Sequence, residues 1–146
     1  MIALLDVNVL VALAWPNHVH HGAAHDWYAR NRAQGWATSP PTQAGFVRVS
    51  SNAKILPGAK SPREAFAVLQ TITRLPDHVF LPDDVDLGAS AHFQHERLLG
   101  YRQVTDAHLL AIALSHGAAL ATFDRGVSQL LPAGQDKHLL EIPAVR

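Results

Sequence analysis

Residues 1–16 read MIALLDVNVLVALAWP and place one carboxylate, Asp6, between two apolar runs. Residues 2–6 are predicted to form a buried strand, and residues 9–15 a short helix that ends at Pro16. A charged side chain at the end of a core strand is costly unless another group pairs with it. Asp6 is therefore the first candidate functional residue.

The composition predicts a single globular domain over residues 1–146, because 48% of the residues are hydrophobic. Twelve basic residues balance twelve acidic ones, so the chain lacks the overall positive charge typical of nucleic-acid-binding proteins, although local patches or bound metal ions can supply it. The absence of cysteine excludes disulfides and thiolate metal sites. With no signal-peptide pattern and no apolar run long enough for a bilayer, the sequence predicts a soluble, cytoplasmic protein.

Apolar strand patterns alternate with helical patterns along the chain. Further strands are expected at residues 36–39, 78–82, 118–124 and 138–143, and helices at 19–34, from about Pro41, at 61–75 with Ser61 as N-cap, at 84–100 and at 104–117. This alternation predicts a parallel sheet covered on both faces. In such sheets functional groups gather beyond the carboxyl ends of the strands, where Asp6 and Asp124 both lie.

Three aspartates stand out: Asp6, Asp106 in the first turn of a predicted helix, and Asp124 after a predicted strand. Each alone has an ordinary explanation as a helix cap, a partner of the helix dipole or a turn residue. Together, three carboxylates at one sheet edge repel one another unless a cation neutralises them. Hard oxygen ligands suit Mg²⁺ or Mn²⁺, and such ions can activate a water and stabilise in-line displacement at phosphorus.

Four segments carry a family resemblance: LLDVNVLVAL (4–13), ATSPPTQAGFVRVSS (37–51), RQVTDAHLLAIALSHGAALATFD (102–124) and LLEI (139–142). In this order they resemble the PIN-domain ribonucleases, in particular the VapC toxins of bacterial toxin–antitoxin pairs. The resemblance implies an α/β fold, a three-layer α/β/α sandwich with a central parallel sheet. It also implies Mg²⁺- or Mn²⁺-dependent endonucleolytic cleavage of structured RNA (transfer or ribosomal RNA), a VapB-like antitoxin and a homodimer.

The resemblance also implies roles for individual residues. Asp6, Asp106 and Asp124 match the acidic metal ligands, and Thr122 matches a hydroxyl residue that supports the site; Asn8 is assigned a supporting role as well. Where many relatives have a glutamate, this chain has Gln43, as does a family branch with a TQ.GF.R pattern. A neutral amide cannot act as a base, but its oxygen can bind a metal or orient a water. Gln43 is thus either catalytic or a hydrogen-bonding residue inside the pocket.

Basic residues and histidines give weaker signals. Arg48, Lys54, Arg102 and Arg125 flank the acidic residues in sequence and are candidate RNA-phosphate contacts, or else solvated surface. Four histidines, His18, His20, His21 and His25, suggest zinc, yet proximity alone is weak evidence, so capping and surface roles are expected. No catalytic role is assigned to His108. The apolar residues of 92–101 suit either core packing or a dimer contact.

Two other functions are alternatives to the predicted ribonuclease. Phosphotransferases with an aspartyl nucleophile need a second Asp two residues later, where this chain has Asn8, so that class is rejected. The remaining alternative is a degenerate PIN module that binds RNA or protein without cleavage, which only Gln43 supports. Cleavage that a chelator abolishes would separate the two.

Overall fold

Five short parallel strands form the centre of the protein, and the computed structural model describes residues 1–143. The strands are β1 (Ala3–Leu5), β2 (Trp36–Thr38), β3 (His78–Phe80), β4 (Ala119–Thr122) and β5 (Leu139–Glu141). Their order across the sheet is β3-β2-β1-β4-β5, and every neighbouring pair is parallel. The predicted parallel sheet is confirmed.

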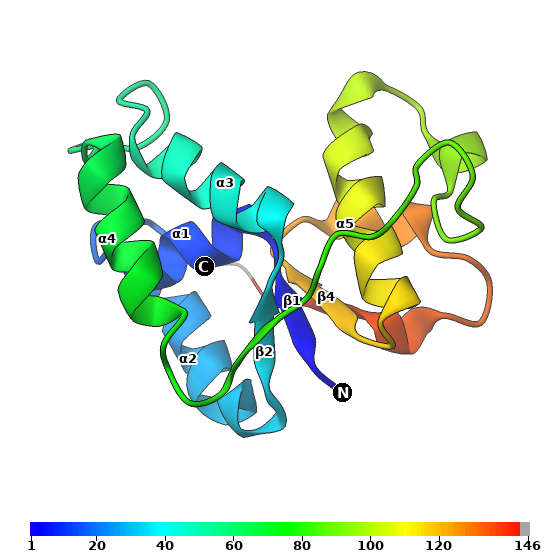
Figure 1. The fold of residues 1–146 in the computed structure, drawn as a ribbon, viewed down its shortest axis with the longest axis horizontal. Coiled ribbons are helices and arrows are strands. Elements are labelled where there is room, and N and C mark those ends of the chain that lie inside the picture. Colours follow the sequence, from blue (N-terminus) through cyan, green and yellow to red (C-terminus); the bar gives the residue numbers. More distant parts are fainter. Residues whose placement is uncertain (144–146) are drawn as a thin grey trace.

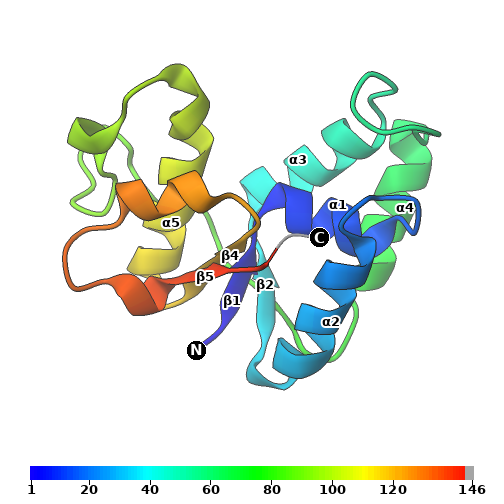
Figure 2. The ribbon, with the colours of Figure 1, turned by 180° about the vertical axis from the view of Figure 1, so that it is seen from behind.

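Helices cover both faces of this sheet. They are α1 (Val7–Ala14), α2 (His21–Asn31), α3 (Pro40–Ser50), α4 (Pro62–Ile72) and α5 (Val104–Ser115), with short 3-10 helices η1 (Arg32–Gln34), η2 (His95–Arg97), η3 (Tyr101–Gln103), η4 (Arg125–Leu130) and η5 (Asp136–His138). Helices α1 to α4 lie on one side of the sheet and α5 on the other (Figure 1), and the view from behind shows the same division (Figure 2). Within residues 1–143, no helix has the length and apolar character needed to cross a membrane.

Two hydrophobic clusters, one on each face, hold the layers together. In β1, Ala3 and Leu5 belong to the cluster beneath α1 to α4, whereas Leu4 belongs to the cluster beneath α5. This alternation follows from the two-residue repeat of a strand, and both faces of β1 are fully covered. The arrangement is the expected three-layer α/β/α fold.

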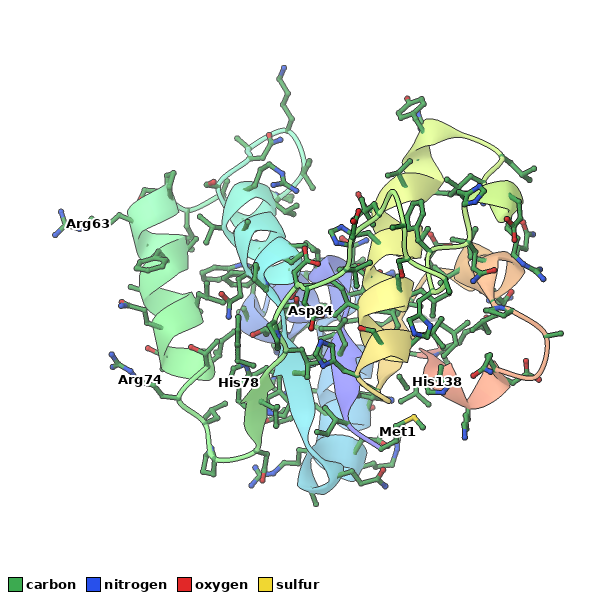
Figure 3. The ribbon with its side chains drawn as sticks, turned by 45° about the vertical axis from the view of Figure 1, so that its right-hand side comes forward. Met1, Arg63, Arg74, His78, Asp84 and His138 are labelled. Carbon is green, nitrogen blue, oxygen red and sulfur yellow. The ribbon has the colours of Figure 1, made fainter. Side chains whose placement is uncertain are left out.

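The predicted helix over residues 84–100 is wrong. The structure has turns there, with only the short η2 as regular structure; Asp84 is labelled in Figure 3. The Asp86 side chain accepts a hydrogen bond from Gly88 N at 3.1 Å, and the Ser90 hydroxyl accepts one from His92 N at 3.0 Å. Such local side-chain bonds compete with the helical ladder, and Gly88 weakens the helix further.

Helix starts were easier to predict, as α4 illustrates. Ser61 Oγ accepts a hydrogen bond from Glu64 N at 3.1 Å, and Glu64 Oε1 accepts one from Ser61 N at 3.2 Å. With Pro62 at the first helical position, these bonds form a capping box. The expected start at Ser61 is therefore confirmed.

From β1 the sheet grows in both directions: β2 and β3 lie to one side of it, and β4 and β5 lie to the other. This division between β1 and β4 marks where a site can form. From β1 the chain enters α1 on one face, whereas β4 is reached from α5 on the other face. Asp6 N, just past β1, donates a hydrogen bond to Ala121 O of β4 at 3.0 Å. Open parallel sheets bind ligands beyond the carboxyl ends of two strands that diverge in this way.

Candidate active site

Asp6 lies directly beyond the carboxyl end of β1 and is only 7% exposed. It is the N-cap of α1, and its Oδ1 accepts a hydrogen bond from Val7 N at 2.7 Å. Its Oδ2 accepts a second bond, also 2.7 Å, from the hydroxyl of Thr122 at the end of β4. Burial raises the pKa of Asp6, and the negative charge of Asp124 raises it further, while the bonds from Thr122 and Val7 oppose this shift.

The second aspartate, Asp124, is connected to Asp6 through Thr122. The Thr122 Oγ1 accepts a hydrogen bond from Asp124 N at 3.0 Å, so one hydroxyl bridges the two acidic residues. Asp124 is exposed, and its Oδ1 accepts a hydrogen bond from Gly126 N at 2.8 Å at the start of η4. Asp6 and Asp124 therefore also have the ordinary capping roles that their positions suggest.

The third aspartate, Asp106, is half-buried in the first turn of α5. Its pKa is raised to about 7, first by burial and then by the negative charges of Asp6 and Asp124. The three carboxylates are thus close enough to repel one another. Among the residues that the structure describes, no ion pair between side chains includes any of these three aspartates.

Carboxylate oxygens without a cationic partner are suitable ligands for a divalent cation. Residues 1–143 nevertheless contain no group of three or more His, Asp or Glu side chains already spaced to hold a metal ion. The fold therefore brings Asp6, Asp106 and Asp124 close enough for their charges to interact, but not into the spacing of a formed metal site. A cation would have to draw Asp106 and the exposed Asp124 inward.

Gln43 projects from the first turns of α3 and is anchored by a hydrogen bond. Its Nε2 donates to Thr38 Oγ1 at 2.9 Å, and Thr38 Oγ1 lies 2.7 Å from Nε2 of His78, labelled on β3 in Figure 3. Burial lowers the pKa of His78, which favours a neutral ring able to accept the Thr38 proton. The amide nitrogen of Gln43 is thus engaged, and the catalytic role of Gln43 stays a prediction.

The remaining predicted residues are at the surface. Asn8, Arg48, Lys54, Arg102 and Arg125 are all exposed. Arg125 follows Asp124 directly in the chain, and Arg102 lies in η3, immediately before the helix that carries Asp106. Their roles in supporting the site or binding RNA stay predictions.

The histidines near α1 have structural roles. His21 Nδ1 lies 2.7 Å from Ala12 O, and His25 Nε2 lies 3.2 Å from Leu13 O. These carbonyls belong to the last turn of α1, whose backbone acceptors have no helical partner. The expected capping role agrees with this geometry for His21 and His25. His108 Nε2 lies 3.0 Å from Asp83 Oδ2, on the connection from β3.

Sequence reasoning missed the role of Gly45 in α3. A Cβ atom at this position would lie 2.6 Å from Cγ2 of Val7, the residue that follows Asp6. Only glycine allows α3 to approach the start of α1 so closely. The GF pair in the quoted TQAGF segment was the available signal, but close helix contact cannot be inferred from one sequence.

Comparison with known proteins identifies the family. Residues 3–130 match the PIN domain. The chain is 46% identical over 134 residues to Ribonuclease VapC39 of Mycobacterium tuberculosis, covering 92% of this chain and 96% of that protein. It is 51% identical over 128 residues to Ribonuclease VapC38 of the same species, covering 88% and 89%.

Solved structures agree on the fold. The VapBC2 structure from Rickettsia felis, bound to a DNA fragment from its promoter, superposes with a TM-score of 0.63 at 13% identity, covering 98% of this chain and 100% of that one. The sarcin–ricin-loop-cleaving toxin VapC20 of Mycobacterium tuberculosis gives a TM-score of 0.55 at 17% identity, covering 86% and 92%. With the PIN domain matched over residues 3–130 and relatives up to 51% identical over most of its length, this chain belongs to the PIN-domain family of VapC ribonucleases.

Proposed function

We propose that this protein is the toxin of a toxin–antitoxin pair and cleaves structured RNA, with transfer or ribosomal RNA as the substrate class, in a reaction that requires Mg²⁺ or Mn²⁺. One observation carries the proposal: Thr122 bridges Asp6 and Asp124 at the sheet edge where the negative charge of both reaches Asp106. Family membership supports the same reading, since the similar proteins from Mycobacterium tuberculosis are named ribonucleases.

Asp6, Asp106 and Asp124 are the residues that would hold the cation. When bound, Mg²⁺ or Mn²⁺ lowers the pKa of a water and stabilises the charge that develops on the phosphate. Thr122 fixes the orientation of the Asp6 carboxylate through its 2.7 Å hydrogen bond. Burial and the two neighbouring carboxylates raise the pKa of Asp106 to about 7, and Asp106 would have to be deprotonated to hold the cation.

A cleavage assay tests this function. Purified protein is incubated with total bacterial transfer and ribosomal RNA in Mg²⁺ or Mn²⁺, and the new 5′ ends are sequenced. We expect discrete cuts that EDTA and Asp106→Asn abolish, whereas Asp26→Asn, an exposed aspartate on α2, leaves them unchanged. RNA binding without EDTA-sensitive cleavage would instead support the degenerate module, in which Gln43 has replaced a required glutamate.

We also propose a VapB-like antitoxin as partner, as in the VapBC2 structure of Rickettsia felis. A basic side chain of the antitoxin, above all Arg, would pair with Asp6, Asp106 and Asp124 and so exclude both cation and RNA. A homodimer and a cytoplasmic location belong to the same proposal. If the purified protein is monomeric and does not bind the product of a small neighbouring reading frame, both partner proposals fail.

A further inference from the structure

Tyr101 and Arg102 form an exposed aromatic–cation pair just before α5. Tyr101 is 80% exposed, which is unusual for a large aromatic side chain. The Arg102 guanidinium carbon lies 5.7 Å from the centre of the Tyr101 ring, and Arg102 Nε donates a hydrogen bond to the Tyr101 hydroxyl at 3.3 Å. The arginine thus contacts the ring, and most of the tyrosine surface stays exposed.

This pair immediately precedes the helix that carries Asp106. The 3-10 helix η3 continues directly into α5, and Asp106 is the third residue of α5. From the rise of the two helix types, Tyr101 and Asp106 are about 9 Å apart along the axis, roughly the length of three stacked nucleotides. The same geometry turns Tyr101 about 200° around the axis from Asp106, so Tyr101 cannot touch the bond that is cleaved.

The charge of the pair favours RNA as its occupant. Three carboxylates give the site a negative potential that repels phosphate, and Arg102 supplies positive charge at its border. Aromatic rings combined with arginine are typical platforms for single-stranded nucleic acid, because every base can stack on them. The neighbouring Leu99 is 86% exposed, and a contact with another protein would explain this exposure equally well. The experiment must therefore distinguish RNA binding from a protein contact.

We propose that Tyr101 stacks on a nucleobase of single-stranded RNA that flanks the cleaved bond, while Arg102 contacts its phosphate; the inference rests on the proposed ribonuclease function. Because Tyr101 binds a flanking nucleotide, it contributes equally to binding of the substrate and of the transition state. Its loss therefore raises KM and leaves kcat unchanged.

Fluorescence anisotropy with a twelve-nucleotide oligo(A) RNA in EDTA tests the binding step without cleavage. We expect Tyr101→Ala to weaken binding at least fivefold, Tyr101→Phe to retain it, and an abasic oligonucleotide of equal length to be insensitive to Tyr101→Ala. Arg102→Gln should weaken binding of both oligonucleotides. It should also reduce the slope of the logarithm of the binding constant against the logarithm of salt concentration by about one. Phe66→Ala, a 52% exposed aromatic on α4, is the matched control.

The outcomes separate this inference from the proposed function. If the wild type cleaves RNA but Tyr101→Ala binds and cleaves normally, the platform is refuted while the ribonuclease stands. If oligo(A) binding depends on Tyr101 but no cleavage occurs, the platform stands and the enzyme function fails. If Tyr101→Ala instead dissociates a dimer in sedimentation equilibrium without weakening RNA binding per subunit, the surface is a contact between two copies and the inference is overturned.

Discussion

The hydroxyl of Thr122 donates a 2.7 Å hydrogen bond to the carboxylate of Asp6, although 116 residues separate the two in the chain. The same oxygen accepts a bond from the backbone of Asp124. Parallel pairing of β1 with β4, with Leu5 opposite Ala121, brings them together. A single buried side chain is therefore hydrogen-bonded to two of the three acidic residues.

Thr122→Val removes the hydroxyl and keeps the shape of the side chain. Asp6 Oδ2 then loses its donor inside the protein, which should cost about 1.5–3 kcal/mol in the free energy of unfolding at pH 8. We expect RNA cleavage to fall at least tenfold, because the Asp6 carboxylate is no longer oriented. Urea unfolding and initial cleavage rates provide the measurements, with Thr122→Ser as the control that keeps the bond. Equal losses in both variants would show that the hydrogen bond is not the cause.

Asp106→Asn should stabilise the metal-free protein at high pH. The pKa of Asp106 is about 7 in the folded state, above the value near 4 expected when unfolded. The folded state therefore retains a proton that the unfolded state releases, and wild-type stability falls as the pH rises from about 4 to 7. Asparagine removes this loss, a gain of about 1–2 kcal/mol at pH 8 once solvent screening of a half-buried group is allowed for.

Urea unfolding in EDTA at pH 5 and pH 8 checks this result. The advantage of Asp106→Asn should appear at pH 8 and largely vanish at pH 5, while Asp26→Asn shows no such change. Added Mn²⁺ at pH 8 should then raise the Tm of the wild type but not of Asp106→Asn. A pH-independent difference would mean that neither burial nor the two neighbouring carboxylates raise the pKa of Asp106 in the folded protein.

Gln43→Glu should increase metal affinity and RNA cleavage only slightly. Three aspartates already supply the charge for one divalent ion with waters completing its shell, and a fourth carboxylate adds repulsion in the metal-free protein. Mn²⁺ affinity and cleavage should therefore change less than tenfold, and stability in EDTA should fall. Isothermal titration and cleavage rates measure both. A tenfold gain in both, equivalent to about 1.4 kcal/mol, would show that the native protein is an attenuated nuclease.

Gly45→Ala should disturb the site through the contact between α3 and the start of α1. The added Cβ would lie 2.6 Å from Val7 Cγ2, so the Val7 side chain or the start of α1, which Asp6 caps, must move. A loss of about 1–3 kcal/mol in stability and a fall in cleavage are expected. Gly22→Ala is the matched control, because that glycine is also helical but has no atom within 4 Å of the new Cβ. A Gly45→Ala protein as stable and active as Gly22→Ala would refute this packing role.

Much of the fold was predictable because its signals are local. The strand repeats and the Ser61 capping box could be read from neighbouring residues, and the rule for parallel sheets placed Asp6 near Asp124. The helix prediction for residues 84–100 failed because the side chains of Asp86 and Ser90 accept hydrogen bonds from backbone N–H groups two residues later. These local bonds outweigh a moderately helical composition. The packing role of Gly45 could not be predicted, because the residue that it contacts, Val7, is distant in the sequence.

The pairing of β1 with β4 also has a consequence during synthesis. Asp6 is made 116 residues before Thr122 and 118 residues before Asp124. At typical translation rates of about 5–20 residues per second, at least about 6 seconds separate the first aspartate from its bonding partner. A nascent chain on the ribosome thus cannot assemble its acidic centre until Asp124 has been made.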